Sequence, residues 1–235
     1  TSTGRLSSKE PNLQNIPRPS TCPTVKIDGV EYKINIRQAF IPEDDCLLGD
    51  CDYNQLEFRV GVHLSQDAKA IAFIKADKDI HAEMASQLTG VPVNEVPKMM
   101  RQFAKNMVFA TMFDASIDGL VYMFKKDFPF IDKQIAERFI KHIRISFPDL
   151  YFNALDMKKF AKDNNYVQTL FGRRRYFPLI TVDNEKDIMK QATNSPIQGS
   201  ASDICLLAAQ RIEREVSGVY IHMLVHDSIV FSYKP

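Results

Sequence analysis

Two aspartates follow strongly apolar stretches, where a carboxylate could do chemistry. Asp52 comes shortly after an apolar run at residues 47–49, and Asp227 separates two β-rich runs near the end of the chain. A carboxylate beside a buried strand is unfavourable unless it is paired or binds a cation. Two carboxylates on neighbouring strand ends can hold a pair of Mg²⁺ ions for in-line phosphoryl displacement. Each aspartate alone is also compatible with a solvated turn.

A second group of residues recurs at every fourth position of the segment 97–113. If this segment is helical, one slanting stripe contains Arg101, Lys105, Phe109 and Phe113. Two cations followed by two aromatic rings suit a nucleoside triphosphate, because cations hold phosphates and rings pack on sugar and base. The same pattern is also typical of a core face with a solvated edge.

A third group is basic. Residues 172–176 read Gly-Arg-Arg-Arg-Tyr, which could contact the phosphates of a nucleic-acid backbone or form a solvated turn. Spacing alone does not identify a function from these three groups.

The elements that must position these residues include both strands and helices. Residues 25–36 alternate in polarity around the turn signal Asp28-Gly29, and residues 220–231 form two β-rich runs that meet at His226-Asp227. Residues 1–24 are rich in Pro, Ser, Thr and Asn, which indicates an extended segment, and a turn is expected around 172–175. Helices are expected over 54–65, 79–89, 97–113, 132–146 and about 200–216.

The composition is that of a globular protein. The 235 residues (26.9 kDa) are 45% hydrophobic and 25% charged, which excludes a disordered tail, a collagen and a coiled coil. The net charge of +1 means that affinity for nucleic acid must come from local basic clusters. No apolar run approaches the roughly 20 residues of a membrane span, so we expect no membrane partner and a cytoplasmic location. The four cysteines lack zinc spacing and are expected to be reduced thiols.

Taken together and in order, several stretches resemble the sequence motifs of family A DNA polymerases, the DNA polymerase I type. The match to the opening palm motif is TGRLSS at 3–8 with PNLQNIP at 11–17, and the match to motif A is DYNQLEFR at 52–59. Motif B corresponds to the pattern R-x-x-x-K-x-x-x-F at 101–109. The series ends with NSPIQG at 194–199 and with VHD at 225–227, which matches motif C.

The resemblance implies an α+β fold, with an antiparallel palm sheet that carries both aspartates and a mostly helical fingers subdomain. It places the palm at 1–65 and 166–235 and the fingers at 66–165, with the 97–113 helix in the fingers. The family's exonuclease and thumb regions have no counterpart here. The chain is therefore expected to be a fragment of a right-hand polymerase without its thumb.

The implied activity is template-directed DNA synthesis, in which deoxynucleotides are added to a primer 3′-hydroxyl and pyrophosphate is released. Asp52, Asp227 and the backbone carbonyl of Tyr53 would hold two Mg²⁺ ions. Lys105 would also protonate the leaving group. The expected partners are primer–template DNA and deoxynucleoside triphosphates, in replication or repair, and a processivity factor stays unspecified.

The resemblance also assigns binding residues. Arg101, Lys105 and His81 would contact the triphosphate, and Glu57 would exclude ribonucleotides by lying below the sugar. The full nucleotide-binding set is Gln55, Glu57, His81, Arg101, Lys105, Phe109 and Phe113. Contacts to primer–template, mainly to sugar, phosphate and the minor groove, would come from Arg5, Asn12, Gln14, Asn15, Arg59, Asn194, Gln198 and His226.

The sequence departs from the family's pattern at four positions. Phe113 stands where motif B usually has Tyr, so the hydroxyl that helps position Glu57 is missing, and Asp114 replaces a Gly. Ser228 stands where motif C usually has Glu, which removes a third carboxylate, and Lys190 replaces an Arg. The divergent motif B favours a phage source, in which case the location is the host cytoplasm.

Two alternatives remain. A single-subunit phage-type RNA polymerase also ends motif C in His-Asp-Ser, but Glu57 and the TGRLSS opening are features of the DNA enzymes. An inactive DNA-binding relic is favoured by the missing Glu at 228. The retention of Asp52 and Asp227 argues against it.

Overall fold

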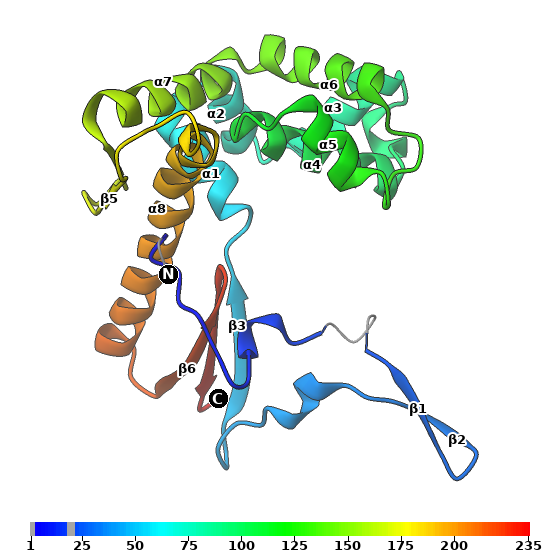
Figure 1. Ribbon diagram of the computed structural model, residues 1–235. Helices are drawn as coiled ribbons and strands as arrows, with labels where there is room; N and C mark the ends of the chain where they lie inside the picture. The colour runs from blue at the N-terminus through cyan, green and yellow to red at the C-terminus, as the bar shows by residue number, and fades with distance from the viewer. Residues whose placement is uncertain (1–2, 18–21) are drawn as a thin grey trace. The chain divides into compact units, whose positions relative to one another are not determined.

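The computed structural model describes residues 3–17 and 22–235. This chain divides into two compact units: unit 1 comprises residues 1–54 and 201–235, and unit 2 comprises residues 55–200. Figure 1 shows most of the antiparallel strands in the first unit and most of the helices in the second. This mixture of helices and antiparallel strands confirms the α+β prediction. The palm and fingers boundaries given above stay a prediction.

Unit 1 is built on a three-stranded antiparallel sheet in the order β3–β7–β6. Strand β3 spans Leu47–Asp52, β6 spans Val219–Val225 and β7 spans Ser228–Tyr233. The predicted terminal hairpin is confirmed, since β6 and β7 pair with Val225 opposite Ser228. A Cβ at Gly49 inside β3 would lie 2.6 Å from the ring of Phe231 on the neighbouring strand, so any larger residue there would displace that ring.

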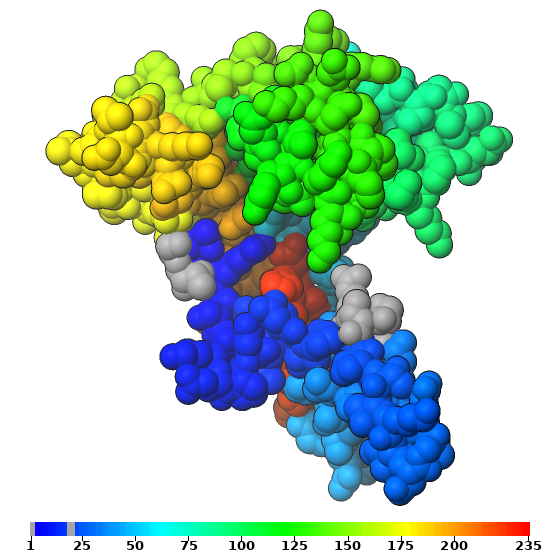
Figure 2. Space-filling view, turned by 45° about the vertical axis from the view of Figure 1, so that its right-hand side comes forward, coloured from blue at the N-terminus to red at the C-terminus, as the bar shows by residue number. Residues whose placement is uncertain are grey.

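The second hairpin of unit 1 is also as predicted. Strands β1 (Thr24–Ile27) and β2 (Val30–Lys33) pair around Asp28-Gly29, where both residues have positive φ. This hairpin projects from the rest of its unit and exposes apolar side chains such as Ile27 and Tyr32 (Figures 1 and 2). Short 3₁₀ turns lie at η1 (Leu13–Asn15) and η3 (Ile36–Ala39).

Unit 2 is mostly helical, and four of its helices match the expected ranges to within two residues. These are α1 (Leu56–Ser65), α3 (Ile80–Thr89), α4 (Lys98–Met112) and α6 (Lys133–Ser146). Three further helices were not predicted from the sequence: α2 (Ala68–Lys75), α5 (Ile117–Phe124) and α7 (Pro148–Asn164). A 3₁₀ turn, η4, covers Val93–Glu95.

The core of unit 2 centres on an aromatic cluster. Phe103 of α4 is fully buried, and its ring lies 4.8–5.2 Å from the rings of Phe128, Phe130 and Phe139 in edge-to-face geometry. Such pairs add to the burial of apolar area, so they hold α4 firmly against α6 and the loop before it. The opposite face of α4 carries Arg101 and Lys105, which are only partly buried.

Of the two expectations about residues 166–216, the start of the helix was wrong and the basic turn is confirmed. The helix expected from about 200 begins much earlier, because α8 runs over Glu185–Glu215 and contains Pro196. The serine hydroxyls on both sides of that proline bond to carbonyls inside the helix, Ser195 to Gln191 at 2.6 Å and Ser200 to Pro196 at 2.6 Å. The basic turn is the end of a hairpin between β4 (Tyr166–Gln168) and β5 (Arg174–Tyr176).

None of the helices in the described part of the chain combines the length and the apolar character that crossing a membrane requires.

Candidate functional site

The predicted pair of aspartates lines one cavity in unit 1. This carboxylate cavity, as we call it, has a volume of about 500 Å³. Its lining includes Arg37, Asp50, Asp52, His226, Asp227 and Ser228. Asp52 is the last residue of β3, and Asp227 occupies the turn between β6 and β7. The expectation that these carboxylates occupy neighbouring strand ends agrees with the sheet order.

The backbone fixes this arrangement. Asp52 pairs with Ser228 in the β3–β7 register, and the N–H of Tyr53 donates to the carbonyl oxygen of Asp227 at 3.2 Å. His226 adopts a left-handed conformation (φ 56°), which lets the chain reverse in the two residues between the strands. The turn therefore places the Asp227 carboxyl group beside the end of β3.

The electrostatics of the cavity disfavour a bare pair of carboxylates. Burial raises the pKa of Asp227, and the nearby Asp52 carboxylate raises it further, whereas Arg5 and His226 oppose these effects. Burial and the same two aspartates raise the pKa of the neighbouring Cys205 thiol to about 11, so this thiol stays protonated at neutral pH.

Mg²⁺ fits the chemistry of these donors. Carboxylate and carbonyl oxygens are its preferred ligands, and it is commonly held by one or two carboxylates while other positions keep water or substrate phosphates. Within residues 3–17 and 22–235, no three His, Cys, Asp or Glu side chains converge closely enough to hold a metal ion. The protein's own share of such a site would therefore come from Asp52, Asp227 and the carbonyl of Tyr53.

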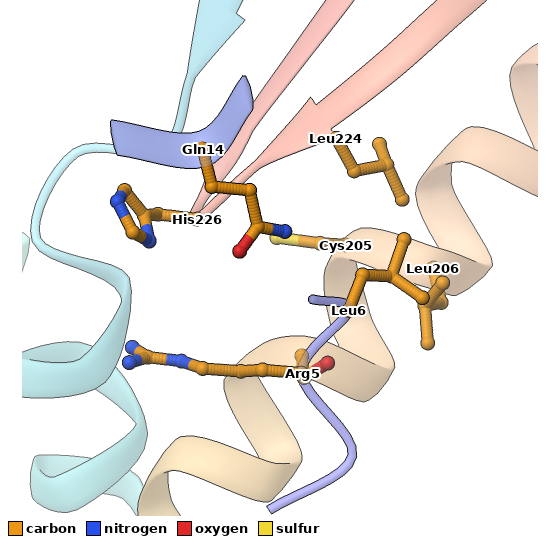
Figure 3. A pocket seen from close by; sticks show the side chains of 8 residues that line it. Arg5, Leu6, Gln14, Cys205, Leu206, Leu224 and His226 are labelled. Carbon is orange, nitrogen blue, oxygen red and sulfur yellow. The ribbon is translucent and has the colours of Figure 1, made fainter. Parts of the chain in front are cut away.

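A small second cavity of unit 1 brings together three of the predicted DNA contacts. Arg5, Gln14 and His226 line a space of about 20 Å³ together with Leu6, Ser202, Cys205, Leu206 and Leu224 (Figure 3). Residues 3–6 are tied to α8, because the hydroxyl of Ser202 donates to the carbonyl of Gly4 at 3.0 Å. Asn12 instead caps η1 by accepting from the N–H of Gln14 at 3.2 Å, and Asn15 ends the same turn.

The predicted triphosphate stripe lies on α4 of unit 2. Lys105 stands 6.0 Å from the centroid of the Phe109 ring, and the rings of Phe109 and Phe113 are 6.4 Å apart. Arg101 is paired with Asp79, the residue that caps α3. Burial opposes ionisation of Asp79, but the hydrogen bonds from Arg101 and the α3 backbone lower its pKa. Sequence reasoning missed Asp79 as the partner of Arg101.

His81 lies beneath this stripe and is fully buried. Its Nε2 is 3.0 Å from Oε1 of Gln55, and its ring packs near Phe58 and Phe109 at 5.9 and 6.3 Å. Burial lowers the pKa of His81 to about 4, so the ring is neutral at pH 7. Contact with a triphosphate would require this side chain to become exposed.

The remaining predicted residues occupy helices of unit 2. Glu57 is partly buried and Arg59 is exposed, one helical turn from the start of α1. Asn194 and Gln198 lie on α8 on either side of Pro196, and each is partly buried. Each of these four polar side chains is at least partly exposed to solvent.

Asp114, one of the departures from the family pattern, binds two cations at the end of α4. Its carboxylate lies 3.1 Å from Arg144 of α6 and 2.5 Å from Lys158 of α7. We expect Asp114→Asn to lower the free energy of unfolding by about 1–2 kcal/mol, because the pairs are half-buried and the isosteric amide keeps the left-handed backbone (φ 47°). Urea denaturation measures this change in free energy. The control is Asp163→Asn, which removes the carboxylate of an exposed ion pair with Lys159. Equal midpoints for parent and variant would contradict it.

Comparison with known proteins shows which family the chain belongs to. The family described as DNA polymerase family A matches residues 1–235. DNA polymerase I of Caldicellulosiruptor bescii is 38% identical over 98% of this chain, and the thermostable DNA polymerase I of Thermus aquaticus is 36% identical over 98%. The chain spans 26% of each of these relatives.

A solved structure has the same fold. The polymerase domain of Pol1 from M. smegmatis, in complex with DNA primer-template and dNTP, aligns with the whole chain at a TM-score of 0.81 and 31% identity, and 40% of that structure is covered. The sequence match over the full chain and the shared fold lead to one conclusion. This chain belongs to DNA polymerase family A.

Proposed function

We propose that this chain contributes the catalytic centre of a template-directed DNA polymerase, which joins deoxynucleotides to a primer 3′-hydroxyl and releases pyrophosphate. The observation that carries the proposal is that Asp52 and Asp227 line the same cavity at the end of an antiparallel sheet. The family membership supports it, as does the neighbour that was solved with primer-template and dNTP.

In this proposal the carboxylates of unit 1 hold two Mg²⁺ ions, with help from the Tyr53 carbonyl. Bound ions of this kind neutralise the charge that develops on phosphate oxygens during in-line displacement. The chain's own residues would fix the positions of the ions, because the β3–β7 register fixes Asp52 and the turn fixes Asp227. The location proposed for the protein is the cytoplasm.

Unit 2 would bind the incoming nucleotide. Arg101 and Lys105 would hold the triphosphate, and Lys105 would donate a proton to the leaving pyrophosphate. Phe109 would pack against the sugar, while Gln55, Glu57, His81 and Phe113 would complete the nucleotide site. Primer–template contacts would come from Arg5, Asn12, Gln14, Asn15, Arg59, Asn194, Gln198 and His226. Palm limits of 1–65 and 166–235 and fingers limits of 66–165 are part of the proposal.

Primer extension tests this function directly. The folded chain is given a primed template and Mg²⁺, with dNTPs and rNTPs offered in separate reactions and EDTA as the metal-free control. Extension with dNTPs that EDTA abolishes is the expected result. A preference for rNTPs would support the RNA polymerase alternative. Binding of primer–template without any extension would support an inactive relic.

The ring at Phe113 should affect sugar selection. We expect Phe113→Tyr to increase the preference for dNTPs over rNTPs by about threefold to tenfold, because one added hydrogen bond that fixes Glu57 is worth about 1 kcal/mol. The measurement is the ratio of kcat/KM for dATP and ATP on one template. Phe152→Tyr, an exposed position on α7, is the control for adding a hydroxyl. Unchanged selectivity in Phe113→Tyr would contradict the expectation.

A further inference from the structure

Ser228 and Asp50 are linked across the sheet that carries the carboxylate cavity. The hydroxyl of Ser228 donates to Oδ1 of Asp50. In the β3–β7 register Ser228 stands opposite Asp52 and Asp50 stands opposite Val230, so the bond is a diagonal one. Ser228, which stands where motif C usually has Glu, therefore has a carboxylate as its hydrogen-bond partner.

Asp50 faces the same cavity as the proposed metal ligands. It is two residues before Asp52 on β3, and side chains two apart on a strand share a face. Both line the carboxylate cavity with Asp227. Among the described residues of that lining, Arg37 is the one Lys or Arg, and its guanidinium donates to the carbonyls of Ile16 and Pro17 at 3.2 and 3.3 Å. The described part of the lining therefore contains three acidic side chains, Asp50, Asp52 and Asp227, and one Arg.

We propose that Asp50, held by Ser228, supplies the third carboxylate of this cavity and raises its affinity for a divalent cation. It acts through its charge and not as a ligand, because no three acidic side chains in the described residues converge on one point. This proposal rests on the proposed function. It places on β3 the negative charge that the usual motif C glutamate would place on β7.

The hydrogen bond explains how a side chain on an exposed strand keeps this position. A serine hydroxyl cannot replace a carboxylate in charge, but it can fix the rotamer of a neighbouring one. Since one oxygen of Asp50 accepts from Ser228, the second oxygen remains available to the water shell of a cation. Salt screens a charge that acts at a distance more than it weakens a direct metal–ligand bond. The dependence of cation affinity on ionic strength therefore distinguishes the two roles.

The test is a titration with Mn²⁺, used as a spectroscopic probe for Mg²⁺, on the folded chain without nucleic acid. Electron paramagnetic resonance reports free Mn²⁺, so the readout does not depend on activity. We expect Asp50→Asn to weaken Mn²⁺ binding by about threefold to tenfold at low salt and less at high salt. Asparagine has the same shape and still accepts from Ser228, so only the charge is removed.

Matched variants isolate that charge. Asp44→Asn, an exposed position outside the cavity lining, removes the same charge from the same unit and should leave Mn²⁺ affinity unchanged. Asp50→Glu should keep most of the parent's affinity. The double variant Asp50→Ser with Ser228→Glu returns the carboxylate to β7 and should also restore it. Circular dichroism checks the fold of each, and Asp50→Ser alone replaces Asp50→Asn if the latter does not fold.

The outcomes separate this inference from the proposed function. If Asp52→Asn abolishes Mn²⁺ binding while Asp50→Asn and Asp50→Ser bind like the parent, the role of Asp50 is overturned and the metal site stands. If Asp52→Asn also binds like the parent, both proposals fail. A loss in Asp50→Asn that Asp50→Glu does not rescue would identify a structural role and overturn the inference.

Discussion

Replacing Asp227 by Asn should reduce deoxynucleotide incorporation at least about a thousandfold without unfolding the chain. That factor corresponds to about 4 kcal/mol of lost transition-state stabilisation, in the range that a metal-binding carboxylate supplies. The fold should tolerate the change, because Asp227 is partly buried beside Asp52 and its ionised form is disfavoured there. Single-turnover primer extension measures the rate, and thermal unfolding measures the stability.

Two controls make this result specific. Glu31→Gln removes one carboxylate from the exposed β1–β2 hairpin and should leave incorporation within twofold of the parent. Affinity of Asp227→Asn for primer–template should fall by no more than a few-fold, because the proposed phosphate contacts come from basic and amide side chains. A variant that still extends primers at a tenth of the parent's rate would remove Asp227 from the catalytic centre.

The carboxylate site could be predicted from the sequence because its determinants are local. Asp52 and Asp227 each follow an apolar strand pattern, and the turn at His226-Asp227 is visible in the sequence. The stripe on α4 could be predicted for the same reason, since a period near four residues defines a helical face. The register between β3 and β7 could not be predicted, and the bond between Ser228 and Asp50 depends on it.

Ion pairs between residues that lie far apart in the sequence also could not be predicted. Asp114 meets Arg144 and Lys158, which are 30 and 44 residues away, and only the packing of α4 against α6 and α7 brings them together. The start of α8 was missed for a different reason. Proline usually interrupts a helix, so the sequence around Pro196 does not indicate a helix, but here the helix continues through it.

His81 shows how burial changes the chemistry of a predicted residue, and its titration should be visible in the stability of the protein. The pKa of His81 is about 4 in the fold, against an ordinary value of 6.5. Below about pH 6.5 the unfolded chain therefore takes up a proton that the native chain does not, and the free energy of unfolding should fall as the pH is lowered to about 4. The total loss should be about 3 kcal/mol, because one pKa unit corresponds to about 1.4 kcal/mol.

The surroundings of His81 fix the sign of this effect. Burial lowers its pKa most, the Asp79 carboxylate raises it, and the cations of Arg101 and Lys105 lower it. Asp79 itself has a lowered pKa, so its own loss of stability comes at still lower pH than its ordinary value of 3.8. Asp227, whose pKa is raised, changes the free energy of unfolding in the opposite direction above pH 3.8, so a variant that lacks the His81 ring is needed to isolate the histidine.

Urea denaturation at a series of pH values, for the parent and for His81→Gln, isolates the contribution. Glutamine retains a polar partner for Gln55 but does not titrate, so its unfolding free energy should be flatter between pH 6.5 and 4 than the parent's. His142→Gln is the control, because His142 is only partly buried on α6 and bonds to Gln87 at 3.0 Å. Parallel pH profiles for the parent and His81→Gln would show that the pKa of His81 in the fold is close to its ordinary value of 6.5 and would contradict the expectation. A histidine that stays neutral down to pH 4 can donate one hydrogen bond and accept another, but it offers no positive charge to a triphosphate. Any role of His81 at the nucleotide site would then depend on exposure of the ring when the nucleotide binds.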